Sequence, residues 1–223
     1  MKFSFLHDGA PLELDISAMA NAGYAGREQD SVRAHIEELR AIGVKAPESV
    51  PTFYPVPMLQ LTSDGEIQVG HAQTSAEIEY VFIRSGGKEY ITVGSDHSDR
   101  ALEAYSVCAA KQICPNVIAG ELWDYGSVKE HFDMLELLCE YEQDGVWHEY
   151  QRGSCGQLLP PEELLRLGRS VLPDGDFALY SGTIPTAGEL AFSRRWRCTM
   201  CDPQSGKKIS FEYIAQQMPD AIE

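Results

Sequence analysis

Apolar and polar residues alternate along much of the chain, and this alternation predicts a protein built mostly from strands. Within residues 1–20, Phe3 and Phe5 share one face, and Leu12 and Leu14 repeat the pattern. Because neighbouring side chains of a strand point to opposite faces of a sheet, such a segment can bury one side and expose the other. The same pattern returns over residues 66–70, 77–84, 89–95, 177–181, 190–200 and 207–214.

Helical spacing replaces this alternation in a few segments. Residues 31–42 carry apolar side chains three or four positions apart, between a capping residue, Asp30 or Ser31, and a terminating Gly43, which predicts a helix. The remaining segments are predicted helices over residues 98–111 and 161–170 and an amphipathic segment over residues 130–144.

The proportion and order of these elements predict the fold class. Strands outnumber helices and do not alternate with them regularly, so we expect an α+β protein that is mainly β. Prolines are frequent in residues 46–57, which predicts an extended connection. We therefore divide the chain into an N-terminal region, residues 1–57, with strands, one helix and this connection, and a β domain, residues 58–223.

The acidic composition narrows the choice of partners. The chain of 223 residues has a formal net charge of −16, and an acidic surface disfavours binding to phosphate backbones. No apolar run approaches the roughly 18 residues that a membrane helix needs. The apolar run at the N-terminus is too short for a signal peptide. We therefore expect a cytoplasmic protein that binds a small-molecule substrate, with no nucleic-acid and no membrane partner.

The cysteines are expected to remain reduced thiols, because no secretory signal accompanies them. Cys198 and Cys201 have the spacing of a redox or zinc pair. A structural zinc site needs two more ligands, usually from a second pair, and the sequence has only one pair with this spacing. The alternatives are two core or boundary cysteines in a strand, or a redox or zinc-dependent protein that uses this pair.

Two glutamates in the strand predicted over residues 77–84 are candidates for chemistry. Glu77 and Glu79 share a face with Val81 and Ile83, which are core-type residues. A strand face exposed to solvent would more often continue with polar residues. The alternative is a strand edge with acidic side chains paired to nearby cations.

A hairpin brings a third carboxylate to these two. Gly86 and Gly87 form a good two-residue turn between the strands. If they are the turn, Glu77 falls opposite Asp96, and paired residues lie about 5 Å apart at Cβ. Adjacent anions repel one another, and hard divalent cations such as Mg²⁺, Mn²⁺ and Ca²⁺ prefer carboxylate oxygens. The pattern therefore indicates a metal site at one end of the hairpin.

Motifs in the same order resemble those of the fumarylacetoacetate hydrolase superfamily. That family has a Glu-x-Glu strand, an Asp-x-Ser-x-Arg segment, a lysine-led segment ending in Cys-Pro, and a Thr-Gly-Thr-Pro type loop. The matching segments here are residues 77–79, 96–100, 111–115 and 181–185. Upstream, His35 and Glu38 preserve the His-x-x-Glu half of the family's lid motif, and Tyr24 corresponds to its tyrosine. The asparagine that usually precedes this tyrosine is absent.

The resemblance implies a fold, a metal and a set of site residues. The fold would be the family's mixed β-sandwich or roll with a few peripheral helices, residues 58–223 forming the catalytic domain and the N-terminal helix serving as a lid. The ion would be Mg²⁺, or Mn²⁺ or Ca²⁺, and the family commonly forms homodimers. The implied metal ligands are Glu77, Glu79 and Asp96; the implied catalytic residues are His35, Glu38 and Lys111; and the implied substrate-binding residues are Arg100, Tyr24, Gly182 and Thr183.

The resemblance also implies a class of reaction. Family members act on oxo-acids and diketo-acids through an enolate held on the metal. We expect a divalent-metal-dependent hydrolase or lyase, with C–C bond hydrolysis as the preferred outcome. The alternative is a metal-binding protein of this fold that acts as a decarboxylase or tautomerase, or that has no catalytic activity.

Each implied site residue also has an ordinary structural interpretation. His35 could be a boundary histidine on an amphipathic helix, and Thr183 an ordinary turn residue. Lys111 could favour the C-terminus of its helix through the helix dipole. Arg100 could be an ion-pair partner of a nearby acid, Asp96 or Glu103. Contacts in the folded protein distinguish these interpretations.

Overall fold

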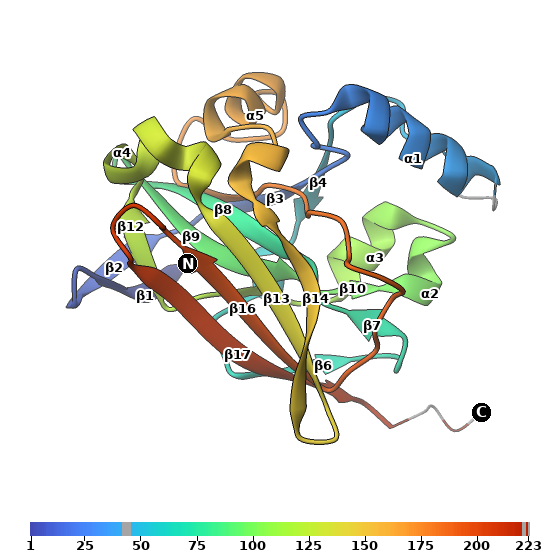
Figure 1. The fold of residues 1–223 in the computed structure, drawn as a ribbon. Coiled ribbons are helices and arrows are strands. Elements are labelled where there is room, and N and C mark those ends of the chain that lie inside the picture. Colours follow the sequence, from blue (N-terminus) through green and yellow to red (C-terminus); the bar gives the residue numbers. More distant parts are fainter. Residues whose placement is uncertain (42–45, 220–221, 223) are drawn as a thin grey trace.

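Two curved sheets pack against each other in the computed structural model, which describes residues 1–41, 46–219 and 222 (Figure 1). In this described part, the larger sheet contains β1 (Lys2–His7), β2 (Ala10–Asp15), β3 (Ala18–Gly23), β4 (Thr52–Val56), β5 (Leu61–Thr62), β8 (Ile78–Ser85), β9 (Lys88–Asp96), β11 (Asn116–Ile118), β12 (Glu121–Asp124) and β15 (Phe177–Tyr180). Its main path runs β2-β1-β12-β9-β8-β15-β3-β4, while β11 pairs with β9 and with β5.

The second sheet lies in front of β8 and β9 in Figure 1. Its strands are β6 (Glu66–Val69), β13 (Glu136–Gln143), β14 (Val146–Ser154), β16 (Arg195–Cys201) and β17 (Lys208–Gln217), in the order β14-β13-β16-β17-β6. A short pair is formed by β7 (Thr74–Ser75) and β10 (Ser98–Asp99). The protein is therefore mainly β, as the alternation predicts.

Strand β8 is buried on both faces, which explains its nearly continuous apolar sequence. Tyr80 and Phe82 on one face join the core that includes Trp196 of the second sheet. Val81 and Ile83 on the other face join a second core, which is formed by residues of the larger sheet and its connections. The larger sheet thus curls around a core of its own, and the face that carries Val81 and Ile83 leads toward the candidate site.

Short helices surround the sheets. They are α1 (Gln29–Ala41), α2 (Arg100–Glu103), α3 (Val107–Ile113), α4 (Tyr125–Val128) and α5 (Pro161–Leu167), with 3-10 helices η1 (Met58–Gln60), η2 (Lys129–Met134) and η3 (Cys155–Gln157). In Figure 1, α1 lies at the edge of the molecule above α2 and α3. No helix among these described elements combines the length and apolar character that a membrane span requires.

The single helix predicted over residues 98–111 is wrong, because this segment contains a short strand and two helices. Asp99 caps α2 by accepting from the amide of Leu102 at 3.0 Å. Ser106 caps α3 by accepting from the amide of Ala109 at 3.2 Å. Two N-caps seven residues apart divide the segment, since each N-cap residue has an extended backbone and starts a new helix.

Two further predictions require correction. The amphipathic segment over residues 130–144 is the 3-10 helix η2 followed by strand β13. The strand predicted over residues 190–200 begins only at Arg195. Leu190 and Phe192 are about half exposed, at 48% and 49%, so their alternation does not correspond to a buried strand face. The other predicted strands and the helix at residues 161–170 are confirmed, with ends shifted by a few residues. The helix predicted over residues 31–42 is confirmed as far as Ala41, while its predicted end at Gly43 lies outside the described residues.

Strands from both sides of residue 57 share the larger sheet, since β3 pairs with β15 and β1 pairs with β12. The extended connection predicted over residues 46–57 ends in β4, which also joins this sheet. The division of the chain at residue 57 stays a prediction, and so does the homodimer.

Candidate metal and active site

The hairpin predicted from the Gly-Gly turn is confirmed. Ser85 pairs with Lys88 and Ile78 pairs with Ser95, so the whole ladder keeps the predicted register. Gly86 and Gly87 have φ values of 58° and 77°, which only glycine adopts without strain. One residue beyond Ile78, the carbonyl of Glu77 accepts from the amide of Asp96 at 3.0 Å.

Three carboxylates meet at this end of the hairpin. One ligand oxygen from each of Glu77, Glu79 and Asp96 can be chosen so that all lie within 4.8 Å of one another. Glu79 and Asp96 are fully buried, and Glu77 is 8% exposed. Oε2 of Glu79 accepts from the amide of Gly182 at 2.8 Å, whereas its buried Oε1 has no hydrogen-bond partner among the described residues. We call these three residues the carboxylate cluster.

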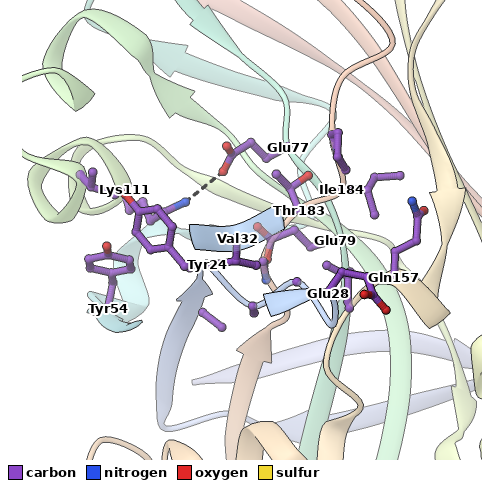
Figure 2. A pocket seen from close by; sticks show the side chains of 18 of the residues that line it. Tyr24, Glu28, Val32, Tyr54, Glu77, Glu79, Lys111, Gln157, Thr183 and Ile184 are labelled. Atoms are coloured by element: carbon purple, nitrogen blue, oxygen red, sulfur yellow. Dashed lines mark hydrogen bonds and ion pairs between the residues drawn. The ribbon is translucent and has the colours of Figure 1, made fainter. Parts of the chain in front are cut away.

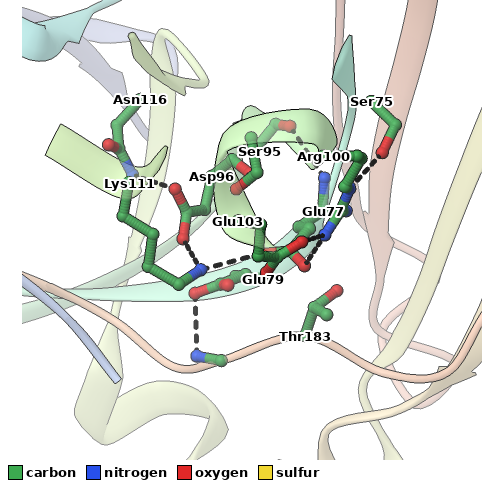
Figure 3. Close-up of polar contacts among 12 residues, drawn as sticks. Ser75, Glu77, Glu79, Ser95, Asp96, Arg100, Glu103, Lys111, Asn116 and Thr183 are labelled. Atoms are coloured by element: carbon green, nitrogen blue, oxygen red, sulfur yellow. Dashed lines mark hydrogen bonds and ion pairs between the residues drawn. The ribbon is translucent and has the colours of Figure 1, made fainter. Parts of the chain in front are cut away.

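Two cations contact the carboxylate cluster from opposite sides (Figure 3). Lys111, in the last turn of α3, donates to Oε2 of Glu77 at 2.9 Å and also contacts Asp96. Arg100, at the start of α2, donates to Oε1 of Glu77 at 2.8 Å and to Glu103 at 2.9 Å. Its Nε also donates to the Ser75 hydroxyl at 2.7 Å. The ion pair between Arg100 and Glu103, one of the structural interpretations of Arg100, is therefore present.

Burial and charge divide the cluster into groups of different acidity. Burial would raise the pKa of Glu77, but the Lys111 and Arg100 cations beside it lower that pKa to about 2. Burial, followed by the Asp96 charge, raises the pKa of Glu79 well above its ordinary range. Burial raises the pKa of Asp96 to about 6 despite the opposing charge of Lys111. One carboxylate is thus held as an anion, while the other two carry a cost for ionisation.

The donor set fits a hard divalent cation. Counting Glu103, four carboxylates face the two cations Arg100 and Lys111, a formal excess of two negative charges. The unpartnered Oε1 of Glu79 is a carboxyl oxygen buried in the protein, and leaving such an atom unpaired is costly. Carboxylate oxygens are the ligands that Mg²⁺, Mn²⁺ and Ca²⁺ prefer. Charge, donor type and the unpaired oxygen therefore all match such an ion.

A cavity of about 490 Å³ opens beside the cluster (Figure 2). Glu77, Glu79 and Lys111 form part of its wall. The other lining residues are Ala22, Gly23, Tyr24, Ala25, Gly26, Glu28, Val32, Tyr54, Glu103, Val107, Gln157, Leu158, Gly182, Thr183, Ile184 and Pro185. The volume suits a small organic acid.

The segment after β3 brings Tyr24 to this cavity in a strained conformation. Its φ is 56°, in the left-handed region that bulky residues rarely adopt. Hydrogen bonds on the same segment hold the backbone: the amide of Leu159 donates to Ala25, and the amide of Arg27 donates to Gln157. Such strain costs on the order of 1–3 kcal/mol and is concentrated at functional sites. The structure thus brings Tyr24 to the same cavity as two residues of the cluster.

The loop after β15 also reaches the cavity. Gly182 has a φ of 82°, and its amide is the one that holds Glu79. The hydroxyl of Thr183 donates to the carbonyl of Ile78 at 2.8 Å, which ties the loop to β8 between the two glutamates. The predicted residues Tyr24, Lys111, Gly182 and Thr183 therefore line one cavity, while Arg100 contacts the cluster without lining it.

His35 and Glu38 cannot be placed in the same detail. Both fall within α1, whose backbone is described, and Val32 of this helix lines the cavity. The side chains of His35 and Glu38 lie outside the described part of the protein. Their assignment as a catalytic dyad stays a prediction.

Sequence reasoning missed several residues of the site. Gln151 on β14 is buried and bridges two segments: it accepts from the amide of Ile78 at 3.0 Å and donates to the Thr183 hydroxyl at 2.8 Å. Tyr54 and Gln157 also line the cavity. Strand β14 lacks a clear alternating pattern, so nothing local identified Gln151. The positive φ of Tyr24 was likewise not visible in the sequence.

Cys198 and Cys201 do not form a common site. They lie three residues apart on β16, so their side chains point to opposite faces. Cys198 is fully buried, with its Sγ 3.8 Å from that of Cys139 on the neighbouring strand, while Cys201 is partly exposed. This arrangement fits the interpretation of two core or boundary cysteines.

Comparison with known proteins gives one family match. A family model described as a protein of unknown function (DUF2848) matches residues 22–213. No curated protein matches the chain. The family match therefore spans every residue of the candidate site, from Tyr24 to the loop after β15.

Solved structures show the fold. A Yersinia pestis protein assigned to the fumarylacetoacetate hydrolase family matches with a TM-score of 0.65 at 15% identity, over 96% of this chain and 100% of that chain. A 5-carboxymethyl-2-hydroxymuconate delta-isomerase from Mycobacterium smegmatis matches with a TM-score of 0.62 at 16% identity, over 93% and 81%. A 2-keto-3-deoxy-D-arabinonate dehydratase complexed with magnesium and 2,5-dioxopentanoate matches with a TM-score of 0.60 at 14% identity, over 92% and 74%. The predicted fold of the fumarylacetoacetate hydrolase superfamily is confirmed.

Proposed function

The chain belongs to the DUF2848 family, and we propose that it is a divalent-metal-dependent enzyme acting on a small 2-oxo acid or diketo-acid. The observation that carries the proposal is the buried carboxylate cluster, two of whose members line a cavity of about 490 Å³. Proteins of the same fold include an isomerase and a dehydratase bound to magnesium and 2,5-dioxopentanoate. These neighbours support the type of ligand, and the cluster supports the metal.

Glu77, Glu79 and Asp96 are the proposed ligands of Mg²⁺, or of Mn²⁺ or Ca²⁺. An ion held there would act as a Lewis acid toward two oxygens of the substrate. The surrounding residues fix the ligands in place. Arg100 holds Glu77, and the amide of Gly182 holds Glu79. We assign Arg100 this positioning role, since its guanidinium already contacts Glu77, Glu103 and Ser75.

Lys111 is the protein residue proposed to stabilise negative charge on the substrate during the reaction. Its ammonium group is buried at the cavity wall, where it contacts Glu77 and Asp96. A fixed positive charge in a water-poor site stabilises negative charge that develops on a nearby substrate oxygen. The Thr183 hydroxyl and the Gly182 backbone are the proposed contacts for the substrate carboxylate, and the Tyr24 hydroxyl for another substrate oxygen.

His35, oriented by Glu38, is the proposed general base. Residues spaced three apart on a helix are close enough for their side chains to interact. A histidine in this role moves a proton to or from the substrate or activates a water molecule. If the water attacks the distal carbonyl, a C–C bond is hydrolysed, and this is the outcome we prefer. If only protons move, the outcome is decarboxylation or tautomerisation.

The experiment uses acylpyruvates and oxaloacetate, with the metal-loaded protein in water enriched in heavy oxygen and, separately, in deuterium oxide. Hydrolysis places solvent oxygen in the released acid, and proton abstraction places deuterium at C3 of the oxo-acid. Release of carbon dioxide without the oxygen label would identify a decarboxylase. The absence of both turnover and deuterium exchange with all of these acids would contradict the proposal. That result would favour a metal-binding protein without activity.

A further inference from the structure

The charges on the cavity wall are strongly unequal. Among the lining side chains that the structure describes, the charged ones are Glu28, Glu77, Glu79, Glu103 and Lys111. Lys111 is the single cation of this set, and it already contacts Glu77 and Asp96. An ion bound by the cluster can neutralise the inner carboxylates and the first carboxylate of a substrate. The described wall then offers no second cation for a second substrate carboxylate.

The nearby arginines do not change this balance. Arg27 is next to the lining residues Gly26 and Glu28, but its two terminal nitrogens donate to both oxygens of Asp133, at 2.6 and 2.7 Å. Its Nε donates to the carbonyl of Leu158 at 3.2 Å. Arg100 is engaged by Glu77 and Glu103. Both guanidinium groups are thus committed to carboxylates of the protein itself.

Glu28 adds a further negative charge to the cavity wall. In Figure 2, Glu28 and Gln157 lie on one side of the cavity, while Lys111, Tyr24 and Tyr54 lie on the other. Glu28 is exposed, on the segment between β3 and α1. A distal carboxylate that reached this side would meet a like charge.

The remaining polar groups suit uncharged oxygen atoms. Tyr24 and Tyr54 line the cavity, and burial raises the pKa of Tyr24 and raises that of Tyr54 to about 12, so both remain neutral hydroxyls. Such groups donate hydrogen bonds to carbonyl or hydroxyl oxygens. Val32, Val107 and Leu158 add apolar surface. The uncharged part of the cavity wall therefore accommodates an apolar or neutral oxygenated chain.

We propose that the substrate is a 2-oxo monocarboxylate whose distal part is uncharged, apolar or carrying carbonyl or hydroxyl oxygens, and that Glu28 helps to exclude a second carboxylate. This inference rests on the proposed function. The charge at the end of the substrate farthest from the 2-oxo acid group would decide which oxo-acids bind. The carboxylate cluster alone does not make this distinction.

The test compares 2-oxoglutarate with its 5-methyl ester, which keep the same carbon chain and differ in the distal charge. The first readout is metal-dependent deuterium exchange at C3, followed by proton NMR. The second is calorimetric binding of each compound to the Mg²⁺-loaded protein. We expect the ester to exceed the diacid at least tenfold in exchange efficiency and in affinity. A diacid that equals or exceeds the ester in both readouts would overturn the inference and leave the proposed function intact.

Variants make the test specific to Glu28. Glu28→Gln should narrow the preference for the ester by about threefold or more, since it removes one like charge from the approach of the diacid. Glu66→Gln, an exposed glutamate on β6 outside the cavity wall, should keep the wild-type ratio. A preference unchanged in Glu28→Gln would remove Glu28 from the inference. Preferential binding of the ester without any exchange would support the charge selection and contradict the chemistry, whereas binding of neither compound would contradict both.

Discussion

The Nζ atom of Lys111 donates to Oε2 of Glu77 at 2.9 Å, within a cluster of buried carboxylates. Lys111 also contacts Asp96, so one ammonium group links two of the three proposed metal ligands. Burial would lower the pKa of Lys111, but the carboxylates of Asp96, Glu77 and Glu79 hold that pKa well above its ordinary range. The lysine therefore stabilises the metal-free cluster and would also repel an incoming cation.

Replacing Lys111 by methionine should therefore have opposite effects with and without metal. In chelator, Lys111→Met should lose about 3–5 kcal/mol of unfolding free energy, because buried carboxylates lose their partner. Saturating Mg²⁺ should stabilise the variant by more than it stabilises the wild type, since one competing charge is gone. Urea unfolding with and without Mg²⁺ measures both. Lys129→Met, at an exposed lysine, is the matched control and should change neither value appreciably.

Metal affinity should rise with pH. Burial raises the pKa of Asp96 to about 6 and that of Glu79 well above its ordinary range, so protons compete with the ion at both ligands. Above pH 6, Asp96 is already ionised before the metal ion binds. Below pH 6, each proton that the ion displaces from the cluster lowers the metal affinity about tenfold per pH unit. Titration with Mn²⁺ at pH 5.0, 6.0 and 7.5 gives the dependence of metal affinity on pH. Equal affinity at all three values would show that no proton leaves the cluster on binding.

Buried His97 should make the metal-free protein sensitive to mild acid. Burial, together with the Arg100 charge, lowers the pKa of His97 to about 3 from 6.5. Below pH 6.5 the histidine is protonated in the unfolded chain, whereas in the folded protein it stays neutral down to about pH 3. The contribution of neutral His97 to the unfolding free energy is therefore complete above pH 6.5 and is lost as the pH falls toward 3. At pH 5.0 the loss from His97 alone should be about 2 kcal/mol, whereas the raised pKa values of Asp96 and Glu79 act in the opposite direction.

The control for this prediction is a second histidine. Between pH 7.5 and pH 5.0, His97→Gln should lose about 2 kcal/mol less unfolding free energy than the wild type does. His148→Gln, at an exposed position on β14, should keep the wild-type loss. Urea unfolding at the two pH values measures all three proteins. An unchanged pH slope in His97→Gln would assign the acid sensitivity to other groups.

His35 should be needed for turnover and dispensable for folding. His35→Ala should keep the free energy of unfolding within about 1 kcal/mol, which is usual for exposed or boundary positions. Turnover of the best oxo-acid should fall roughly a hundredfold or more, the usual loss for a general base. Steady-state kinetics beside urea unfolding measures the two effects. A folded His35→Ala protein with full activity would remove this residue from the site.

The part of the site that lies in one hairpin could be predicted from the sequence. The turn at Gly86 and Gly87 sets the register, and the register brings Glu77 opposite Asp96. The caps Asp99 and Ser106 are also local signals, and they divide the region for which helical spacing alone predicts a single helix.

The wall of the cavity could not be predicted in this way, because it is assembled from segments far apart in the chain. Tyr54, Gln157 and Val107 meet there only because the larger sheet curls and α3 packs against β4. Gln151 fixes the loop at Thr183 by hydrogen bonds from a strand without a clear sequence pattern. Such contacts depend on tertiary packing, which no local pattern records.

The most direct test of the metal site is the stability of the wild type and of Glu79→Gln with Mg²⁺ at about a hundredfold excess over its dissociation constant, compared with chelator. Binding to the folded state alone should raise the unfolding free energy of the wild type by about 2.7 kcal/mol. Glu79→Gln removes the carboxylate whose Oε1 is unpartnered and should lose most of this increase. Equal stabilisation of both proteins, or none of the wild type at any Mg²⁺ concentration, would contradict a metal site at Glu77, Glu79 and Asp96.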